Sequence, residues 1–260
     1  MLGERVQADF AAHAAFDGDV CFMRKDGSPV WARVQGRGVR AHDMAGGTVW
    51  ILEDLTAARE AQQQQDWAAI HDPLTQLCNR EAFVQRMGVL LAERSARART
   101  PGVEAVDAAE GEGDGVMLFL DLDHFTVVND LAGHDAGDDV LRHVARLLES
   151  HVRQIGWAAR LGGDEFAVVL PGCSLARGQA LAEQLRAAVQ AWEPSYQGRS
   201  FTLGVSIGLV VLDASLQDVP SVLYAADMAC YDAKRAGRNR VETRHADQAA
   251  ASGRMALGPV

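Results

Sequence analysis

Residues 157–170 read Trp-Ala-Ala-Arg-Leu-Gly-Gly-Asp-Glu-Phe-Ala-Val-Val-Leu, and this stretch decides the fold of the larger part of the chain. Strand-forming residues stand on both sides of Gly162-Gly163, and glycine adopts the positive φ of a tight turn without strain. We therefore predict a β-hairpin over 157–170 with the glycines at its tip. Asp164 and Glu165 then lie at an exposed, rigid corner. Two glycines beside two carboxylates suit a metal ion together with the phosphate that it binds.

Helices and strands alternate around this hairpin. Hydrophobic periodicity predicts strands at 116–120, 201–212 and 240–242, and helices at 80–98, 138–149, 175–192 and 219–235. The order βαββαβ, with extra elements, indicates an α+β fold of the ferredoxin-like type, the plan that polymerase palms share. We expect the helices to cover one face of the sheet and to leave the other available for substrate. Such a fold does not by itself assign a reaction.

The N-terminal quarter has a different pattern. Strand-like stretches between residues 20 and 53 are broken by turn residues at 25–28 and 45–47, which predicts a three-stranded antiparallel meander. Residues 56–71 contain no glycine or proline and favour a helix. Its apolar seam is weak, so two interpretations stay open: a solvated linker helix, or a parallel coiled coil that holds two copies of the chain in register.

The composition limits what the chain can bind. Its 260 residues, 48% of them hydrophobic, can bury the core of one ordinary domain plus a smaller element. The formal net charge of −10 disfavours a nucleic-acid binder, which needs a basic surface. Residues 104–115 hold five acidic residues and no basic one, and we expect a surface insertion there.

Cysteine usage and hydropathy bear on the compartment. The four cysteines, Cys21, Cys78, Cys173 and Cys230, stand singly, which argues against a zinc site or a disulfide framework and fits a reducing cytoplasm. The sequence has no apolar run of about 18 residues and no signal-peptide pattern. We therefore expect a cytoplasmic protein with no membrane segment in this chain.

Further motifs accompany the pentapeptide Gly162–Phe166 in a fixed order. They are Asp72-Pro73-Leu74-Thr75 and the residues up to Arg80, Asp121-Leu122-Asp123-His124-Phe125, Asn129-Asp130, Gly133-His134, Gly137-Asp138, and Gly237-Arg238-Asn239-Arg240. On these motifs the chain resembles the GGDEF family of diguanylate cyclases, which join two GTP molecules into cyclic di-GMP and release pyrophosphate. The resemblance covers residues 72 to about 243.

The resemblance also suggests a domain organisation. Residues 1–53 resemble the C-terminal part of a PAS sensor domain, because the meander ends in the step Asp54-Leu55-Thr56. Residues 54–71 would be a signalling linker helix, 72–243 the cyclase domain, and 244–260 a disordered tail. The product is symmetric and forms from two identical substrates, so we expect a homodimer with one GTP per subunit.

The chemistry of the family explains the acidic motif residues. Magnesium, or manganese in its place, bound by one or two carboxylates lowers the pKa of an attacking ribose hydroxyl and stabilises the leaving pyrophosphate. By resemblance, Asp121 and Asp164 are metal ligands together with the backbone carbonyl of Leu122, and Asp164 is also assigned the role of general base. Glu165 is a candidate for a second metal or substrate contact, whereas we interpret Asp123 as structural.

Polar residues on either side of a glycine-rich turn resemble the guanine-binding positions. Asn129 and Asp138 match the guanine readers, and His134 a substrate-lining position. Simpler alternatives are a helix C-cap for Asn129, a helix N-cap for Asp138 and a turn histidine without function for His134.

Basic residues at the end of the last long helix resemble the pair that holds the triphosphate. Lys234 and Arg238 stand four residues apart there. Their alternative role is favourable interaction with the negative end of the helix dipole. In an acidic protein with a polyanionic substrate we favour the binding role.

The chain departs from the family pattern at two positions. Thr126 stands where the family usually carries a lysine, and the loss of such a cation is expected to slow the chemistry. Arg153 begins the stretch that corresponds to the Arg-x-x-Asp product-inhibition motif, but Gly156 replaces its aspartate. We therefore expect weak or no product inhibition at that site.

The leading functional hypothesis is an active, magnesium-dependent diguanylate cyclase. An alternative is a catalytically degenerate GTP-binding signalling module. Thr126, in place of the lysine that the family usually carries, would then indicate the loss of catalysis. A third possibility, a cyclase that forms a mononucleotide product, shares the fold but does not predict the pentapeptide.

Overall fold

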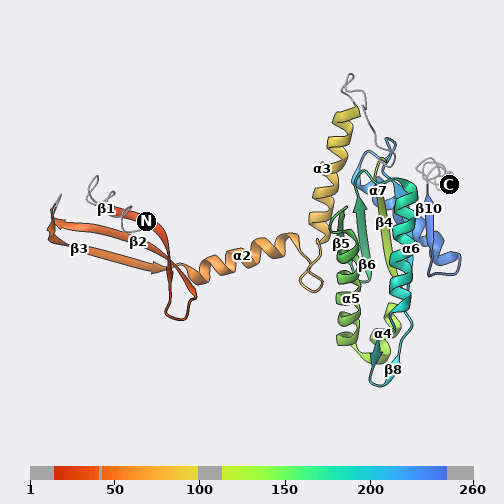
Figure 1. The fold of residues 1–260 in the computed structure, drawn as a ribbon, viewed down its shortest axis with the longest axis horizontal. Helices are drawn as coiled ribbons and strands as arrows, with labels where there is room; N and C mark the ends of the chain where they lie inside the picture. The colour runs from red at the N-terminus through yellow and green to blue at the C-terminus, as the bar shows by residue number, and fades with distance from the viewer. Residues whose placement is uncertain (1–14, 41–42, 99–112, 245–260) are drawn as a thin grey trace, which may run out of the picture. The chain divides into compact units, whose positions relative to one another are not determined.

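The computed structural model describes residues 15–40, 43–98 and 113–244, which are drawn as coloured ribbon in Figure 1. The chain divides into two compact units, Met1–Ala68 and Ala69–Val260. Of the predicted acidic insertion only residues 113–115 are described, and of the predicted tail only Arg244. The predicted domain borders at 53/54, 71/72 and 243/244 stay predictions.

The first unit contains the predicted three-stranded antiparallel meander. Its strands β1 (Ala15–Met23), β2 (Pro29–Arg40) and β3 (Asp43–Asp54) pair in the order β1-β2-β3. The expected turn at 45–47 is wrong, because these residues lie inside β3. Strands β2 and β3 pair from Arg40 and Asp43 onwards, and residues 41–42 lie outside the described part.

Helix α2 (Thr56–Ile70) begins directly after the meander and is fastened to it. The Leu55 amide donates to the Trp31 carbonyl at 2.7 Å, and the Trp31 amide donates to Thr56 Oγ1 at 3.0 Å. Arg59 extends this junction, because its guanidinium pairs with Asp19 at 2.7 Å and stacks 4.2 Å from the centre of the Trp31 ring. No residue of α2 is buried, which leaves both interpretations of this helix open.

The second unit is built on a five-stranded sheet with the order β10-β9-β4-β6-β5. Its strands are β4 (Val116–Asp123), β5 (Trp157–Gly162), β6 (Glu165–Leu170), β9 (Gly204–Val211) and β10 (Val241–Arg244). All neighbours are antiparallel except β10, which runs parallel to β9. The predicted α+β, ferredoxin-like arrangement is thus confirmed. A small hairpin, β7 (Ser195–Tyr196) and β8 (Arg199–Ser200), is an addition that the sequence patterns did not predict.

Helices cover both faces of this sheet, so the expectation of one open face is wrong. Helices α5 (His134–Val152) and α6 (Leu175–Ala191) pack on one face, and α3 (Arg80–Ala98) and α7 (Val219–Arg235) on the other. Every residue of β4 is buried. The continuous apolar run Val116–Leu120 is typical of a strand that is covered on both faces. This pattern could have predicted the second helical layer from the sequence.

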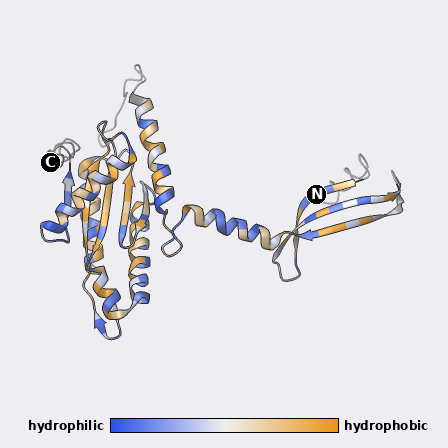
Figure 2. Cartoon of the chain, turned by 180° about the vertical axis from the view of Figure 1, so that it is seen from behind, coloured by the Kyte–Doolittle hydropathy of each residue, from blue (hydrophilic) through white to orange (hydrophobic). Residues whose placement is uncertain are grey.

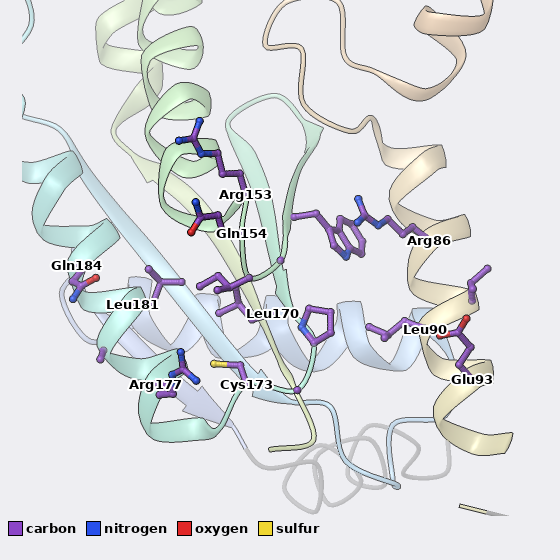
Figure 3. Close-up of a pocket in the computed structure, with 17 residues that line it drawn as sticks. Arg86, Leu90, Glu93, Arg153, Gln154, Leu170, Cys173, Arg177, Leu181 and Gln184 are labelled. Carbon is purple, nitrogen blue, oxygen red and sulfur yellow. The ribbon is translucent and has the colours of Figure 1, made fainter. Parts of the chain in front are cut away.

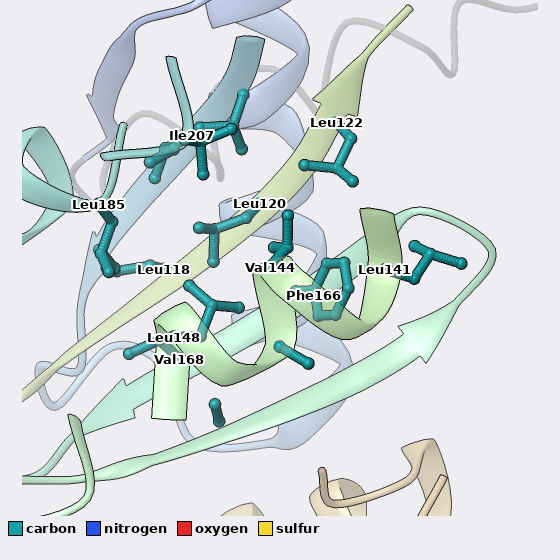
Figure 4. Close-up of a cluster of buried hydrophobic side chains, with 14 of the residues drawn as sticks. Leu118, Leu120, Leu122, Leu141, Val144, Leu148, Phe166, Val168, Leu185 and Ile207 are labelled. Atoms are coloured by element: carbon teal, nitrogen blue, oxygen red, sulfur yellow. The ribbon is translucent and has the colours of Figure 1, made fainter. Parts of the chain in front are cut away.

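The larger core layer lies between the sheet, α5 and α6 (Figure 4). Leu118, Leu120 and Leu122 of β4 point into it, beside Phe166 and Val168 of β6. The complementary residues Leu141, Val144 and Leu148 come from α5, Leu185 from α6 and Ile207 from β9. In Figure 2 these strands are hydrophobic over most of their length. The two central strands are therefore held rigidly, and residues at their ends have fixed positions.

The segment after β4 folds into two helices where only the second was predicted. Helix α4 (Phe125–Ala132) buries Phe125 and Val128, and Gly133, with φ of 89°, separates it from α5. Helix α5 begins at His134, one turn before the expected start at residue 138. Asp138 is therefore inside the helix, and its alternative role as an N-cap is wrong.

Among the described residues, none of the helices has the length and apolar character needed to cross a bilayer.

Gly208 in β9 sets how closely α7 can approach the sheet. A Cβ atom at this position would lie 2.1 Å from the Ala226 carbonyl oxygen and 2.4 Å from the Cys230 amide nitrogen, both of them helix backbone. We predict that Gly208→Ala lowers the free energy of unfolding by about 1 to 3 kcal/mol, as measured by urea unfolding followed by circular dichroism.

Gly88 in α3 provides a matched control. A Cβ there would have only Val219 Cγ2 at 4.0 Å, so Gly88→Ala should stabilise the protein by about 0.5 to 1 kcal/mol through helix propensity. Equal unfolding free energies for the two variants would contradict the packing argument.

Candidate active site

The ends of β4 and β6 bring the acidic motif residues together. The antiparallel register places Asp121 directly opposite Glu165, and the Leu122 amide donates to the Asp164 carbonyl at 3.3 Å. Gly163 and Asp164 form the predicted turn between β5 and β6, and Gly163 has the left-handed φ of 49° that glycine allows. Since side chains alternate along a strand, Asp121 and Glu165 both face the side of the sheet covered by α7.

Arg160 of β5 clamps the turn. Its Nε and Nη2 atoms donate to the Gly163 carbonyl at 3.0 and 2.8 Å, and Nη1 reaches both oxygens of Asp72 at 3.1 Å. Asp72 also accepts from the Thr75 amide and hydroxyl at 2.8 and 2.6 Å. These hydrogen bonds hold the pKa of Asp72 below its ordinary value although burial opposes them. The first motif of the domain thus fixes the position of the acidic turn.

Lys234 of α7 forms an ion pair with Asp121. Its Nζ lies 2.6 Å from Asp121 Oδ2, and the side chains are 34% and 12% exposed. Burial raises the pKa of Asp121, and the Asp164 and Asp123 carboxylates raise it further against the effect of Lys234. The cluster of carboxylates around Asp121 therefore carries excess negative charge and attracts a cation.

Glu165 and Asp227 add to this negative charge. Burial raises the pKa of Glu165, and Asp121, Asp227 and Asp164 raise it further while Arg80 opposes them. Sequence reasoning did not single out Asp227. The available signal was its position seven residues before Lys234, because that spacing places both side chains on one face of α7.

Asp123 has a structural role, in agreement with its interpretation from the sequence. It is 4% exposed and accepts from the Ser206 hydroxyl at 2.7 Å and from the Asn239 amide at 2.8 Å. The second bond fixes the loop after α7, in which Arg238 and Asn239 both have left-handed φ values of 63° and 44°. Left-handed non-glycine residues often mark functional sites, and this loop carries one of the two predicted phosphate ligands.

The predicted guanine readers lie together on α4 and α5. A Cβ atom at Gly137 would be only 1.9 Å from Asn129 Oδ1, so the Asn129 side chain lies against the turn of α5 that carries Asp138. The Asp138 carboxylate is 3.7 Å from Arg142 one turn further along. Asn129 lies within α4 and is not its C-cap, which is Gly133. His134 is the exposed first residue of α5.

A cavity of about 890 Å³ lies at the end of the β5–β6 hairpin far from the acidic turn, at the stretch that corresponds to the product-inhibition motif (Figure 3). Arg86, Arg153 and Arg177 line it from three different elements. Gly156 is also part of its wall, but a Cβ atom there would lie 2.0 Å from the Val169 carbonyl oxygen. This position has no room for a carboxylate side chain.

The structure thus places Asp121, Leu122, Asp164, Glu165 and Lys234 at one edge of the sheet. Arg238 follows in the loop that Asp123 fixes, and Thr126 is exposed in the first turn of α4. In the described part of the chain, no group of three or more His, Cys, Asp or Glu side chains is arranged to hold a metal ion. Two carboxylates still suit magnesium, which keeps waters and substrate phosphates as its other ligands.

A known protein family and curated sequences match most of this chain. The profile of the family described as "Diguanylate cyclase, GGDEF domain" matches residues 69–240. Probable diguanylate cyclase DgcE of Escherichia coli is 36% identical over 205 residues, which cover 79% of this chain and 17% of that protein. Diguanylate cyclase DgcP of Pseudomonas aeruginosa is 38% identical over 190 residues, 73% of this chain and 26% of that protein.

Solved structures agree with the sequence matches. The coiled coil and GGDEF domain of DgcB from Caulobacter crescentus, solved in complex with c-di-GMP, has 29% identity and a TM-score of 0.63 over 73% of this chain and 93% of that one. Diguanylate cyclase SiaD of Pseudomonas aeruginosa, solved with its activator SiaC, has 30% identity and a TM-score of 0.55 over 72% of this chain and 66% of that one.

These matches show that the chain belongs to the GGDEF family of diguanylate cyclase domains. The chain spans 17% and 26% of the length of the two curated relatives described above. The residues that the family profile matches do not include the meander, so its likeness to the end of a PAS domain stays a prediction.

The hydrogen bonds of Arg160 to Gly163 and Asp72 are expected to stabilise the folded protein. Arg160→Met removes two donors from the Gly163 carbonyl and leaves Asp72 without its cation, so we predict a loss of about 2 to 3 kcal/mol at pH 7. The pKa of Asp72 is lowered in the folded state, so the stabilisation is present above the ordinary value of 3.8 and is lost as the pH falls through the lowered value. The difference between the variants should therefore shrink at acidic pH.

Arg142→Met serves as the control in the same urea experiment. Arg142 pairs with Asp138 and Asp139, but its side chain is 45% exposed. Its removal should cost less than about 1 kcal/mol, since exposed ion pairs contribute little. An Arg160 variant as stable as the Arg142 variant would show that the clamp gives no net stabilisation.

Proposed function

We propose that this chain is an active diguanylate cyclase, which condenses two GTP molecules into cyclic di-GMP as a homodimer with one GTP per subunit. One observation supports the proposal most directly. The pairing of β4 with β6 places Asp121 beside the turn that carries Asp164, and the Lys234 ammonium lies 2.6 Å from the Asp121 carboxylate. Family membership supports the same activity.

The cluster of carboxylates around Asp121 fits a magnesium ion. The Lys234 ammonium already occupies a cation position beside Asp121, and Asp164 and Glu165 lie around it. When bound, magnesium would lower the pKa of the attacking hydroxyl and neutralise charge on the phosphates. Asp121, Asp164 and the Leu122 carbonyl are the groups that would hold it, and Glu165 is the candidate for a second contact.

The basic residues Lys234 and Arg238 bind the triphosphate in this proposal. Lys234 exchanges its contact with Asp121 for a phosphate oxygen when GTP arrives, and Arg238 adds a second cation from the loop fixed by Asp123. Charge-assisted bonds of this kind are about twice as strong as neutral ones. They orient the α-phosphorus so that pyrophosphate can leave in line with the incoming oxygen.

Two bonds form in the complete reaction. The ribose 3′-oxygen of each GTP attacks the α-phosphorus of the other, the bond from that phosphorus to the β-phosphate bridge breaks, and one pyrophosphate leaves per new bond. Asp164 accepts the hydroxyl proton as general base. One subunit holds one nucleotide, so the ring can close only when two sites face each other.

Asn129 and Asp138 recognise guanine in this proposal. An amide and a carboxylate can accept the guanine N–H groups, and a site with such groups rejects adenine by leaving them unpaired. His134 at the start of α5 is the proposed third substrate contact. The meander and α2 would act as the regulatory input, and the coiled-coil interpretation of α2 would supply the dimer contact.

The alternative is a catalytically degenerate GTP-binding module. Thr126 favours it, because a threonine offers one neutral hydrogen bond where the family usually places a cation. The intact acidic turn and the paired Asp121 argue for catalysis, since a module that only binds GTP has no need of both carboxylates.

Asp164→Asn should lower the rate of cyclic di-GMP formation by at least about 100-fold, because a neutral amide cannot hold a divalent cation against a developing alkoxide. Pyrophosphate release and chromatography of the nucleotides measure this rate. Asp114→Asn makes the same chemical change just before β4, at the end of that strand far from Asp121, and should leave the rate unaltered, because its side chain is 61% exposed and pairs with Arg94. Activity near wild type in the Asp164 variant would refute the assignment.

Product inhibition at the cavity of Figure 3 should be weak. Gly156 has no acceptor for the guanine N–H groups, and the loss of charge-assisted bonds weakens binding by about 10- to 100-fold. Titration of cyclic di-GMP into an initial-rate assay tests this, with Arg153→Ala as the matched variant. Sub-micromolar inhibition that disappears in the Arg153 variant would show that the cavity binds product without a carboxylate.

A further inference from the structure

Gly137 is the point at which α5 comes closest to a side chain of α4. A Cβ atom on Gly137 would lie 1.9 Å from Asn129 Oδ1, 3.0 Å from Asn129 Cγ and 3.1 Å from Phe125 Cζ. Phe125 and Asn129 are one helical turn apart, so they present one face of α4 to this position. The Asn129 amide can rest here only because residue 137 has no side chain.

The backbone does not explain the glycine. Gly137 lies inside α5 and is not among the described residues with positive φ, so any L-residue can adopt its conformation. Glycine also weakens a helix interior relative to alanine. The advantage of glycine at 137 is therefore the space that it leaves for Asn129.

The geometry points to Gly137 as a specificity-determining position, which seats the Asn129 amide so that Asn129 and Asp138 can contact the same guanine base. Asp138 is the next residue along α5, and its carboxylate lies 3.7 Å from Arg142. A methyl group at 137 would push the Asn129 amide away from α5, and its hydrogen bonds to a base would be lost. This inference rests on the proposed function, because it assumes that Asn129 and Asp138 are the base readers.

Nucleotide binding tests the inference without requiring turnover. Dissociation constants of the α,β-methylene analogues of GTP and ATP, which cannot release pyrophosphate, are measured by calorimetry with magnesium for wild type and Gly137→Ala, and thermal unfolding is recorded for both. We expect GTP affinity to fall at least about 10-fold and ATP affinity to change little, so that the GTP preference shrinks. Gly88→Ala should keep the wild-type preference, because a Cβ atom at this helical glycine would meet only Val219 Cγ2 at 4.0 Å.

A double-mutant cycle distinguishes an effect of Gly137 on the position of the Asn129 amide from a general effect on packing. Once Asn129→Ala has removed the amide, Gly137→Ala should cause no further loss of GTP affinity. Additive losses, or an equal fall in GTP and ATP affinity, would overturn the inference. A wild-type protein with no preference for GTP would overturn the proposed base site as well, whereas a preference that survives Gly137→Ala overturns the role of Gly137 alone.

Discussion

The antiparallel pairing of β4 with β6 is the constraint on which the rest of the site depends. It sets Asp121 opposite Glu165 and ties the Leu122 amide to the Asp164 carbonyl. Both strands are buried by helices on each face, so their ends cannot shift without disturbing a packed core. Like charges held this closely favour a cation nearby, and the Lys234 ammonium pairs with Asp121.

Three further contacts convert this pairing into a site of fixed shape. Arg160 connects the turn to Asp72 at the start of the domain, and Asp123 connects the end of β4 to the loop that carries Arg238. Gly208 lets α7 lie close enough to the sheet for Lys234 to reach Asp121. Buried polar groups that are fully paired in this way specify one arrangement, whereas a half-paired network would be costly. The residues proposed for catalysis therefore stand on rigid elements and not on independent loops.

Sequence patterns predicted the hairpin, the order of helices and strands along the chain, and the position of Asp164 and Glu165 at the hairpin turn. Each of these depends on local periodicity and on glycines at a turn. The patterns failed where tertiary packing decides. The second helical layer followed from the burial of β4 on both faces, and the early start of α5 from the break at Gly133. Ser206 and Asp227 were missed because they come from β9 and α7, far from the motif in sequence. The lack of space at Gly156 and Gly137 depends on neighbouring backbone and side-chain atoms that no local pattern shows.

The most direct test is the product that the wild-type chain forms from GTP and magnesium, identified by mass spectrometry. If Asp121, Asp164 and Lys234 form a working site, then cyclic di-GMP and pyrophosphate accumulate, and removal of magnesium stops the reaction. Intact GTP that is bound but not converted would contradict catalysis and favour the degenerate module with Thr126 in place of the cation. A cyclic mononucleotide product would contradict the proposal that two nucleotide sites face each other in a dimer.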